Sequence, residues 1–465
     1  MTDPTCWSAS EQAAAVAAGQ LGSEELLDLC LDRIATVDPL VNAVCTLAAE
    51  PARARCRQAD AATARGESWG PLHGLPITIK DAIATEGIRS TGGSTSLRDH
   101  VPAVDAPAVA SLRAAGAIVF GKTNLPEWSG DWQSFNEMFG TTNNPWALSR
   151  TPGGSSGGAA AAVACGMTSF ELGTDIGGSV RVPSAFCGVW GHKPSFGIIP
   201  TLGYLDEPNG GTTESDVNTF GPITRSAADL RVLLDVLAAP VPDDAAGWRL
   251  ALPAAGVGSL RGLRAGVWLD EPALEIDDDM RAVLETAVDG FEAAGAVVDR
   301  SVRPPIDVDR SWRLGARLIG AAVSVSGDDR GLSHRDWLLM HRERAALRAA
   351  WAECFRSVDV VLCPVAIVPA FEHLQAGAWD TRVLQVNGRE RRYLEMEGWP
   401  ALVGAAYLPS TSVPVGRTAT GLPVGMQVVA PFLHDRRAIQ VGEWLADSCG
   451  GGYRMPPVVP HHLTN

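Results

Sequence analysis

Apolar residues recur at helical spacing near the start of the chain. Residues 8–20 open with Ser8 and Glu11 in a capping-box arrangement, and residues 23–37 open with Ser23 followed by two glutamates. Within the second segment the apolar stripe at i, i+3 and i+4 consists of Leu26, Leu27, Cys30, Leu31 and Ile34. The pattern predicts two core-facing helices and a third over Pro51–Arg65.

Short apolar runs then alternate with helical ones. Residues 75–80 alternate isoleucine with polar residues and predict a strand that ends at Lys80. A helix over Pro107–Ala115 and a strand over Ala117–Phe120 follow. This alternation of strand and helix is typical of a three-layer α/β fold.

The second half of the chain repeats the alternation. Residues 263–270, 277–294 and 296–299 predict a strand, a helix and a strand that form one βαβ unit. Further predicted elements are the helices 227–237, 311–357 and 436–445 and the strands 358–363 and 410–414. Residues 311–357 are broken at 327–331, which we interpret as a flap, and Gly197–Pro222 is dense in Gly, Pro, Asn and Thr and predicts a long loop.

Two serine-bearing glycine loops flank an alanine-rich segment between these halves. The first reads GGSSGG at 153–158 and the second reads GTDIGGS at 173–179. Glycine permits positive φ and close approach of the backbone, so two such loops joined by a short helix form a nest of N–H groups around the hydroxyls. Such a nest suits a developing oxyanion and predicts an active site.

The composition of the chain indicates its cellular compartment and excludes some classes of binding partner. The 465 residues carry a formal net charge of −15, which argues against a nucleic-acid surface. No apolar run is long enough for a membrane span, and the N-terminus lacks the pattern of a signal peptide. Nine scattered cysteines without a C-x-x-C pair predict free thiols, a cytoplasmic protein and no metal site.

Lysine is rare in this chain. Only Lys80, Lys122 and Lys193 occur, and the other 35 of the 38 basic residues are arginine. Arginine does not release its proton in a protein, whereas a desolvated lysine becomes a neutral base. Lys80 is therefore a candidate base, and an ion pair with Asp81 or Glu127 is the structural alternative.

The two loops resemble the signature of the amidase signature family, GGSSGG followed by GTDxGGS[IV]R and a KP dipeptide. The family pattern GxPxxxKD is filled by 74–81, and the C-terminal pattern GLPVGxQ by 421–427. The resemblance runs from about Gly74 to Leu445. It implies one α/β/α sandwich over 1–465 with a large mixed twisted sheet. It also implies a catalytic core at about 70–230 and substrate-shaping helices and loops at 300–400.

The resemblance also assigns roles. It identifies Ser179 as the nucleophile, Ser155 on a cis peptide after Gly154 as its partner, and Lys80 as the base. Lys80 would take a proton from Ser155, which takes one from Ser179. The expected oxyanion hole consists of the N–H groups of Ile176, Gly177, Gly178 and Ser179, and the expected supporting residues are Ser156, Asp175 and Arg181.

Other interpretations of the same residues remain open. Asp175 and Arg181 are also typical of an ion pair that braces a loop, and His192 is a rival base that we interpret as structural. Residues 153–157 match the G-x-S-x-G nucleophile elbow, but 146–152 do not read as the strand that an elbow requires. No lysine completes S-x-x-K, and neither loop ends in G-K-[ST].

The expected function is hydrolysis, without cofactor or metal, of C–N bonds in small amides, anilides or carbamates (urethanes). The chain is most similar to bacterial aryl acylamidases and urethanase-type members, and tryptophans near the motifs, including Trp132, indicate an apolar pocket. The expected partner is a small-molecule amide or carbamate bound by a monomer or homodimer, without nucleic acid or membrane. The alternatives are a glutaminase-type subunit of a tRNA-dependent amidotransferase and a non-catalytic scaffold.

Overall fold

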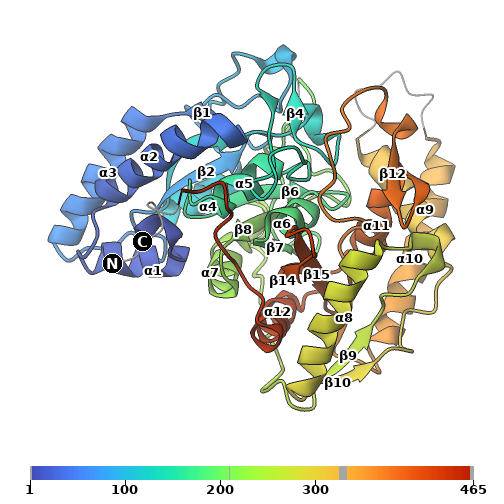
Figure 1. Cartoon of the computed structure of the whole chain (residues 1–465). Helices are drawn as coiled ribbons and strands as arrows, with labels where there is room; N and C mark the ends of the chain where they lie inside the picture. The colour runs from blue at the N-terminus through green and yellow to red at the C-terminus, as the bar shows by residue number, and fades with distance from the viewer. Residues whose placement is uncertain (1–2, 209, 324–331, 461–465) are drawn as a thin grey trace.

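The computed structural model describes residues 3–208, 210–323 and 332–460 (Figure 1). The flap predicted at 327–331 lies outside these residues. The described helices are α1 (Ala9–Ala17), α2 (Ser23–Val41), α3 (Ala49–Ala64), α4 (Pro107–Ala114), α5 (Gly157–Ala164), α6 (Arg181–Cys187), α7 (Ala227–Leu237), α8 (Asp278–Ala293), α9 (Val308–Ala322), α10 (His334–Cys354), α11 (Gly398–Gly404) and α12 (Asp435–Cys449).

The strands of the described residues belong to one large sheet and three small ones. They are β1 (Val44–Leu47), β2 (Pro76–Lys80), β3 (Ile118–Thr123), β4 (Phe135–Asn136), β5 (Gly140–Thr141), β6 (Glu171–Asp175), β7 (Trp190–Lys193), β8 (Thr219–Thr224), β9 (Arg264–Val267), β10 (Val297–Asp299), β11 (Val360–Pro364), β12 (Val383–Val386), β13 (Arg389–Arg392), β14 (Ser410–Arg417) and β15 (Pro423–Val429).

The large sheet is mixed, as predicted. Its order is β10-β9-β11-β15-β14-β7-β8-β6, with β9 parallel to both β10 and β11 and the remaining pairs antiparallel. The predicted βαβ unit is confirmed, because β9, α8 and β10 follow one another and the two strands pair in parallel. Helices lie on both faces of the sheet (Figure 1), with α7 and α12 on one face of the central strands and α6, which packs against α5, on the other.

A smaller sheet brings the predicted strand with Lys80 to the edge of the large one. Its order is β1-β3-β2, and β2 runs parallel to β3. The Thr78 N–H donates to Thr168 Oγ1 at 3.0 Å, and the Ser169 N–H donates to the Pro76 carbonyl at 3.4 Å. These two bonds hold β2 beside the segment that enters β6.

Strand β8 corrects the prediction of a loop over all of 197–222. It lies between β7 and β6, with Gly221 opposite Gly173 and Pro222 opposite Leu172. A proline is disfavoured inside a central strand, so the sequence did not indicate a strand at these residues. A Cβ on Gly221 would lie 2.3 Å from the His192 carbonyl oxygen, which explains why glycine stands there.

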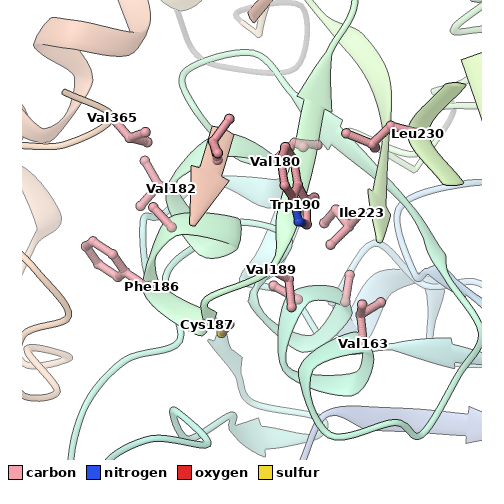
Figure 2. Packing of buried hydrophobic residues seen from close by; sticks show 14 of the residues in the cluster. Val163, Val180, Val182, Phe186, Cys187, Val189, Trp190, Ile223, Leu230 and Val365 are labelled. Atoms are coloured by element: carbon pink, nitrogen blue, oxygen red, sulfur yellow. The ribbon is translucent and has the colours of Figure 1, made fainter. Parts of the chain in front are cut away.

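The two short helices that follow the serine loops lie inside the core. Every residue of α5 and of α6 is buried. Figure 2 shows Val180, Val182 and Phe186 around α6, with Val163 of α5 and Ile223 of β8 close by. A helix buried on all sides needs small or apolar residues all round, and α5 has only Gly, Ala and Val.

None of the described helices is long and apolar enough to cross a membrane.

We predict that Gly158→Ala destabilises the protein. A Cβ at this position in α5 would lie 2.5 Å from both the Asn124 N and O atoms, which are backbone atoms and give way poorly. Overpacking of this kind costs about 1–3 kcal/mol. Unfolding in urea, followed by circular dichroism, measures the change.

The matched control is Gly320→Ala in α9, where a Cβ would meet nothing within 4 Å. There alanine is expected to stabilise the helix by up to about 1 kcal/mol. Equal effects at the two positions would contradict the steric account of Gly158.

Candidate active site

Lys80 lies at the end of β2 and is completely buried. Its Nζ atom lies 2.6 Å from Ser155 Oγ and 2.7 Å from Thr174 Oγ1. The structure therefore brings the predicted base and the predicted middle serine into direct contact. Thr174 is the second partner of the amine.

The environment of Lys80 favours the neutral amine. Burial lowers the pKa of Lys80 well below its ordinary value, while the charges of Asp175 and Glu171 oppose the shift. Neither alternative ion pair forms: Asp81 accepts hydrogen bonds from Thr91, and Glu127 accepts one from Ser94. The amine is thus held by two hydroxyl groups.

Lysine rarity alone does not single out Lys80. Lys122 and Lys193 are also buried, and desolvation lowers the pKa of Lys122 to about 8 and that of Lys193 to about 7. The Lys122 Nζ, however, donates to the Ile83 carbonyl and Thr85 Oγ1, and the Lys193 Nζ donates to the Pro194 carbonyl. Only the Lys80 amine contacts a serine hydroxyl among the described residues.

The first glycine loop presents Ser155 to this amine. The peptide bond between Gly154 and Ser155 is cis. Gly153 has φ +86° and packs so tightly that a Cβ would lie 2.8 Å from Pro183 Cα. Ser134, which carries no signal in the sequence, braces the loop: its Oγ accepts from the Gly157 N–H at 3.0 Å and donates toward the Gly153 carbonyl at 3.1 Å.

The second loop meets the first through backbone and hydroxyl contacts of Ser156. The Ser156 N–H donates to the Ser179 carbonyl at 3.1 Å, and Ser156 Oγ lies 3.3 Å from both the N and O atoms of Thr174. Ser179 is 5% exposed. Its hydroxyl is not hydrogen-bonded to that of Ser155, so the structure places the two serines in adjoining loops without closing that contact.

Asp175 organises the backbone of the second loop. It accepts hydrogen bonds from the N–H groups of Gly178 at 2.9 Å and Val180 at 3.1 Å. The Arg181 guanidinium donates to both of its oxygens, at 3.0 and 2.8 Å. Burial acts to raise the pKa of Asp175, but the charge and hydrogen bonds of Arg181 outweigh it and lower the pKa to about 2.

The four N–H groups expected to form the oxyanion hole differ in whether they are free to bind a ligand. The Gly178 N–H is already bound to Asp175. The N–H groups of Ile176, Gly177 and Ser179 have no acceptor in the described part of the chain, and so remain available to a ligand.

A buried carboxyl group lies over the same loop. A Cβ on Gly177 would lie 3.5 Å from Ile319 Cδ1 and 4.0 Å from Glu397 Oε1. Glu397 is 5% exposed, and its Oε1 has no hydrogen-bond partner among the described residues. Burial raises the pKa of Glu397 to about 8.

His192 lies in a separate, structural cluster. Its ring nitrogens contact Thr411 Oγ1 at 2.9 Å and Asp435 Oδ1 at 3.1 Å, and Asp435 also accepts from the N–H and Oγ of Ser195. His192, Thr411 and Asp435 are all completely buried, so this triad-like arrangement has no access to a substrate. His192 contacts neither Ser155 nor Ser179.

Residues 3–208, 210–323 and 332–460 contain no group of three or more His, Cys, Asp or Glu side chains that could hold a metal ion.

Comparison with known proteins places this geometry in a family. The family model described as Amidase matches residues 25–325 and 324–439. The chain belongs to this family and is an enzyme that acts on amide C–N bonds. A solved bacterial aryl acylamidase of the amidase signature enzymes superposes with a TM-score of 0.82 at 26% identity, over 95% of this chain and 96% of its own. The predicted fold is confirmed.

Two further relatives carry a more specific name. A glutamyl-tRNA(Gln) amidotransferase subunit of Roseiflexus castenholzii is 33% identical over 95% of this chain and 96% of its own length. The solved structure of the subunit of the same name from Thermotoga maritima superposes with a TM-score of 0.79 at 26% identity, over 98% of this chain and 99% of its own.

These relatives correct two predictions. The expected hydrolase of small amides, anilides or carbamates is wrong as the main interpretation, because relatives that align over about nine-tenths or more of this chain are named as amidotransferase subunits. Urethanase specificity finds no support among them. The expected partners, a small molecule without nucleic acid, are contradicted by the same name, which includes tRNA. The substrate could not be predicted from the serine loops, because these loops define the catalytic chemistry and do not specify the substrate.

We predict that Glu397→Gln flattens the dependence of stability on pH. An unfolded glutamate ionises near pH 4.5, whereas the folded carboxyl keeps its proton to about pH 8. Between these values the unfolded state binds fewer protons, so stability falls as the pH rises. The wild-type loss between pH 5 and pH 9 from this group is on the order of 4 kcal/mol.

Thermal unfolding of both proteins at pH 5, 7 and 9 measures this effect. Glu292→Gln, on the exposed part of α8, is the control and should leave the pH profile unchanged. Parallel profiles for wild type and Glu397→Gln would show that Glu397 does not titrate as described.

Proposed function

We propose that this chain is the glutaminase-type subunit of a tRNA-dependent amidotransferase. In this role it hydrolyses the side-chain amide of glutamine and passes the ammonia to a partner subunit bound to tRNA. The observation that carries the proposal is the match to the Roseiflexus castenholzii subunit, which spans 95% of this chain and 96% of that protein. The buried contact between Lys80 and Ser155 supplies the chemistry that such a subunit needs.

The proposed mechanism uses Lys80, Ser155 and Ser179. Neutral Lys80 accepts the proton of Ser155 while Ser155 accepts that of Ser179, and Ser179 Oγ bonds to the amide carbon. The proton returns along the same residues to the leaving nitrogen, which departs as ammonia. Water then cleaves the acyl ester on Ser179, giving glutamate and free enzyme.

The remaining residues take supporting roles in this proposal. The free N–H groups of Ile176, Gly177 and Ser179 stabilise the oxyanion, while Gly178 serves the loop through its bond to Asp175. Ser156, Asp175 and Arg181 hold the two loops together. Residues of about 70–230 form the catalytic core of a single domain, and those of 300–400 shape access to it.

The charge of the chain indicates how tRNA would be held. With a formal net charge of −15 the chain offers little counter-charge to phosphates, so we infer that the partner subunit supplies most of the tRNA contact.

We predict that the chain releases ammonia from glutamine when the partner subunit is present. Ser179→Ala and Lys80→Met should each reduce the rate by at least about 10³-fold, because each removes a group that acts at the reacting atoms. Lys122→Met is the matched control, since it removes another buried lysine that contacts no serine. Ammonia release and amidation of glutamyl-tRNA are measured in parallel.

Two results would overturn the proposal. One is the absence of ammonia release from glutamine by the assembled complex. The other is cleavage of a simple anilide by the isolated chain at a rate far above that for glutamine.

The base role of Lys80 predicts the pH profile. Because burial lowers its pKa, activity should persist to a pH well below that of an ordinary lysine, and should fall as the amine becomes protonated. Burial raises the pKa of Glu171 to about 7, so its charge opposes the shift only above that pH; where the acid limb of kcat lies above pH 7, Glu171→Gln should move it to lower pH. An acid limb that stays in place would argue against Lys80 as the base.

A further inference from the structure

The peptide unit between Gly177 and Gly178 is held at both ends. Its N–H group donates to Asp175 Oδ1 at 2.9 Å, and its carbonyl accepts from the Trp132 indole N–H at 2.9 Å. Gly178 has φ +102°, and two successive glycines are intrinsically free to rotate. The two hydrogen bonds fix the plane of this peptide, and thereby the direction of the N–H groups on either side of it.

Trp132 itself is held in place by a distant segment, residues 374–393. Its ring packs edge-on against Tyr393, with ring centroids 5.5 Å apart, and against Trp379 at 6.2 Å. The preceding Asp131 accepts hydrogen bonds from the Tyr393 hydroxyl and from Arg382 Nη1, both at 2.5 Å. The indole therefore has little freedom to leave the Gly177 carbonyl.

The residues after and around Trp132 complete this connection. The Gln133 side chain bonds to the backbone of Leu374 in both directions, each at 2.8 Å. The backbone of 131–133 also packs against the first glycine loop: a Cβ on Gly154 would lie 2.5 Å from the Asp131 carbonyl oxygen. Residues 131–133 thus contact both serine loops and are themselves held by hydrogen bonds and ring packing with residues 374–393.

We propose that Trp132 is a positioning residue of the oxyanion hole, and that residues 374–393 hold it there through Asp131. Trp132 acts on the Gly177 carbonyl, so its effect falls on the transition state. A ring that merely lined the substrate pocket would change substrate binding instead. The inference rests on the proposed reaction at Ser179 but not on the identity of the amide.

The test is Trp132→Phe, which keeps an aromatic ring and removes the N–H donor. In the assembled complex we expect kcat for glutamine hydrolysis to fall about 10- to 100-fold, with KM changed by less than about twofold. Trp146→Phe is the matched control, because the Trp146 indole N–H likewise donates to a backbone carbonyl, that of Cys187 outside both serine loops, at 2.9 Å. It should leave kcat unchanged.

A second readout is independent of glutamine. A fluorophosphonate probe reacts with an activated serine through an oxyanion-like transition state, and we expect labelling of Ser179 in Trp132→Phe to slow by at least about tenfold. Failure of glutamine turnover with normal wild-type labelling would overturn the proposed function alone. Labelling of Trp132→Phe at the wild-type rate would overturn the role of Trp132, whatever the substrate.

Two further results separate positioning from structural effects. Tyr393→Phe removes one bond to Asp131 and should produce the same loss in kcat at smaller amplitude, about two- to fivefold. It serves if Trp132→Phe fails to fold, as judged by thermal unfolding. An increase in KM with unchanged kcat, or an equal loss in Trp146→Phe, would overturn the proposal.

Discussion

A primary amine buried among hydroxyl groups is the interaction on which the rest of the site depends. Charged ammonium groups are costly to bury, and a carboxylate partner is the usual remedy. Lys80 has two hydroxyls in that place, those of Ser155 and Thr174. These come from a loop and from β6, while the lysine comes from β2. Three separate parts of the chain must therefore meet within hydrogen-bond distance of one nitrogen atom.

The convergence of three chain segments on the Lys80 nitrogen explains why small residues are concentrated around this atom. Helix α5 brings the serine loop close because Gly158 lies against the Asn124 backbone. A Cβ on Gly173 would lie 2.8 Å from Ser156 Oγ, so β6 approaches the first loop only as glycine allows. Glycine in these loops is thus needed as much for the close approach of neighbouring segments as for the conformational freedom of the loop backbone. Residues 131–133 contact both loops and link them to the segment 374–393.

The sequence carried enough information for the elements and for the central residues, but little for what surrounds them. Lys80 was predictable because alternation placed it at the end of a strand and the glycine motifs restricted its partners. Ser134, Thr174 and Trp132 were not, since each acts through a tertiary contact that leaves no periodic signal. Strand β8 was concealed by Gly221 and Pro222, whose local preferences are overridden by neighbouring strands. Substrate identity could not follow from catalytic motifs, which related enzymes share.

The burial of all three lysines also determines the chemistry of the outer surface. Lys80, Lys122 and Lys193 are at most 1% exposed, whereas arginines such as Arg310, Arg356 and Arg389 extend into solvent. The long basic side chains on the surface are therefore arginines, whose guanidinium groups keep their charge at every physiological pH. Acetylation and other acylations of lysine therefore have no exposed target on the folded chain.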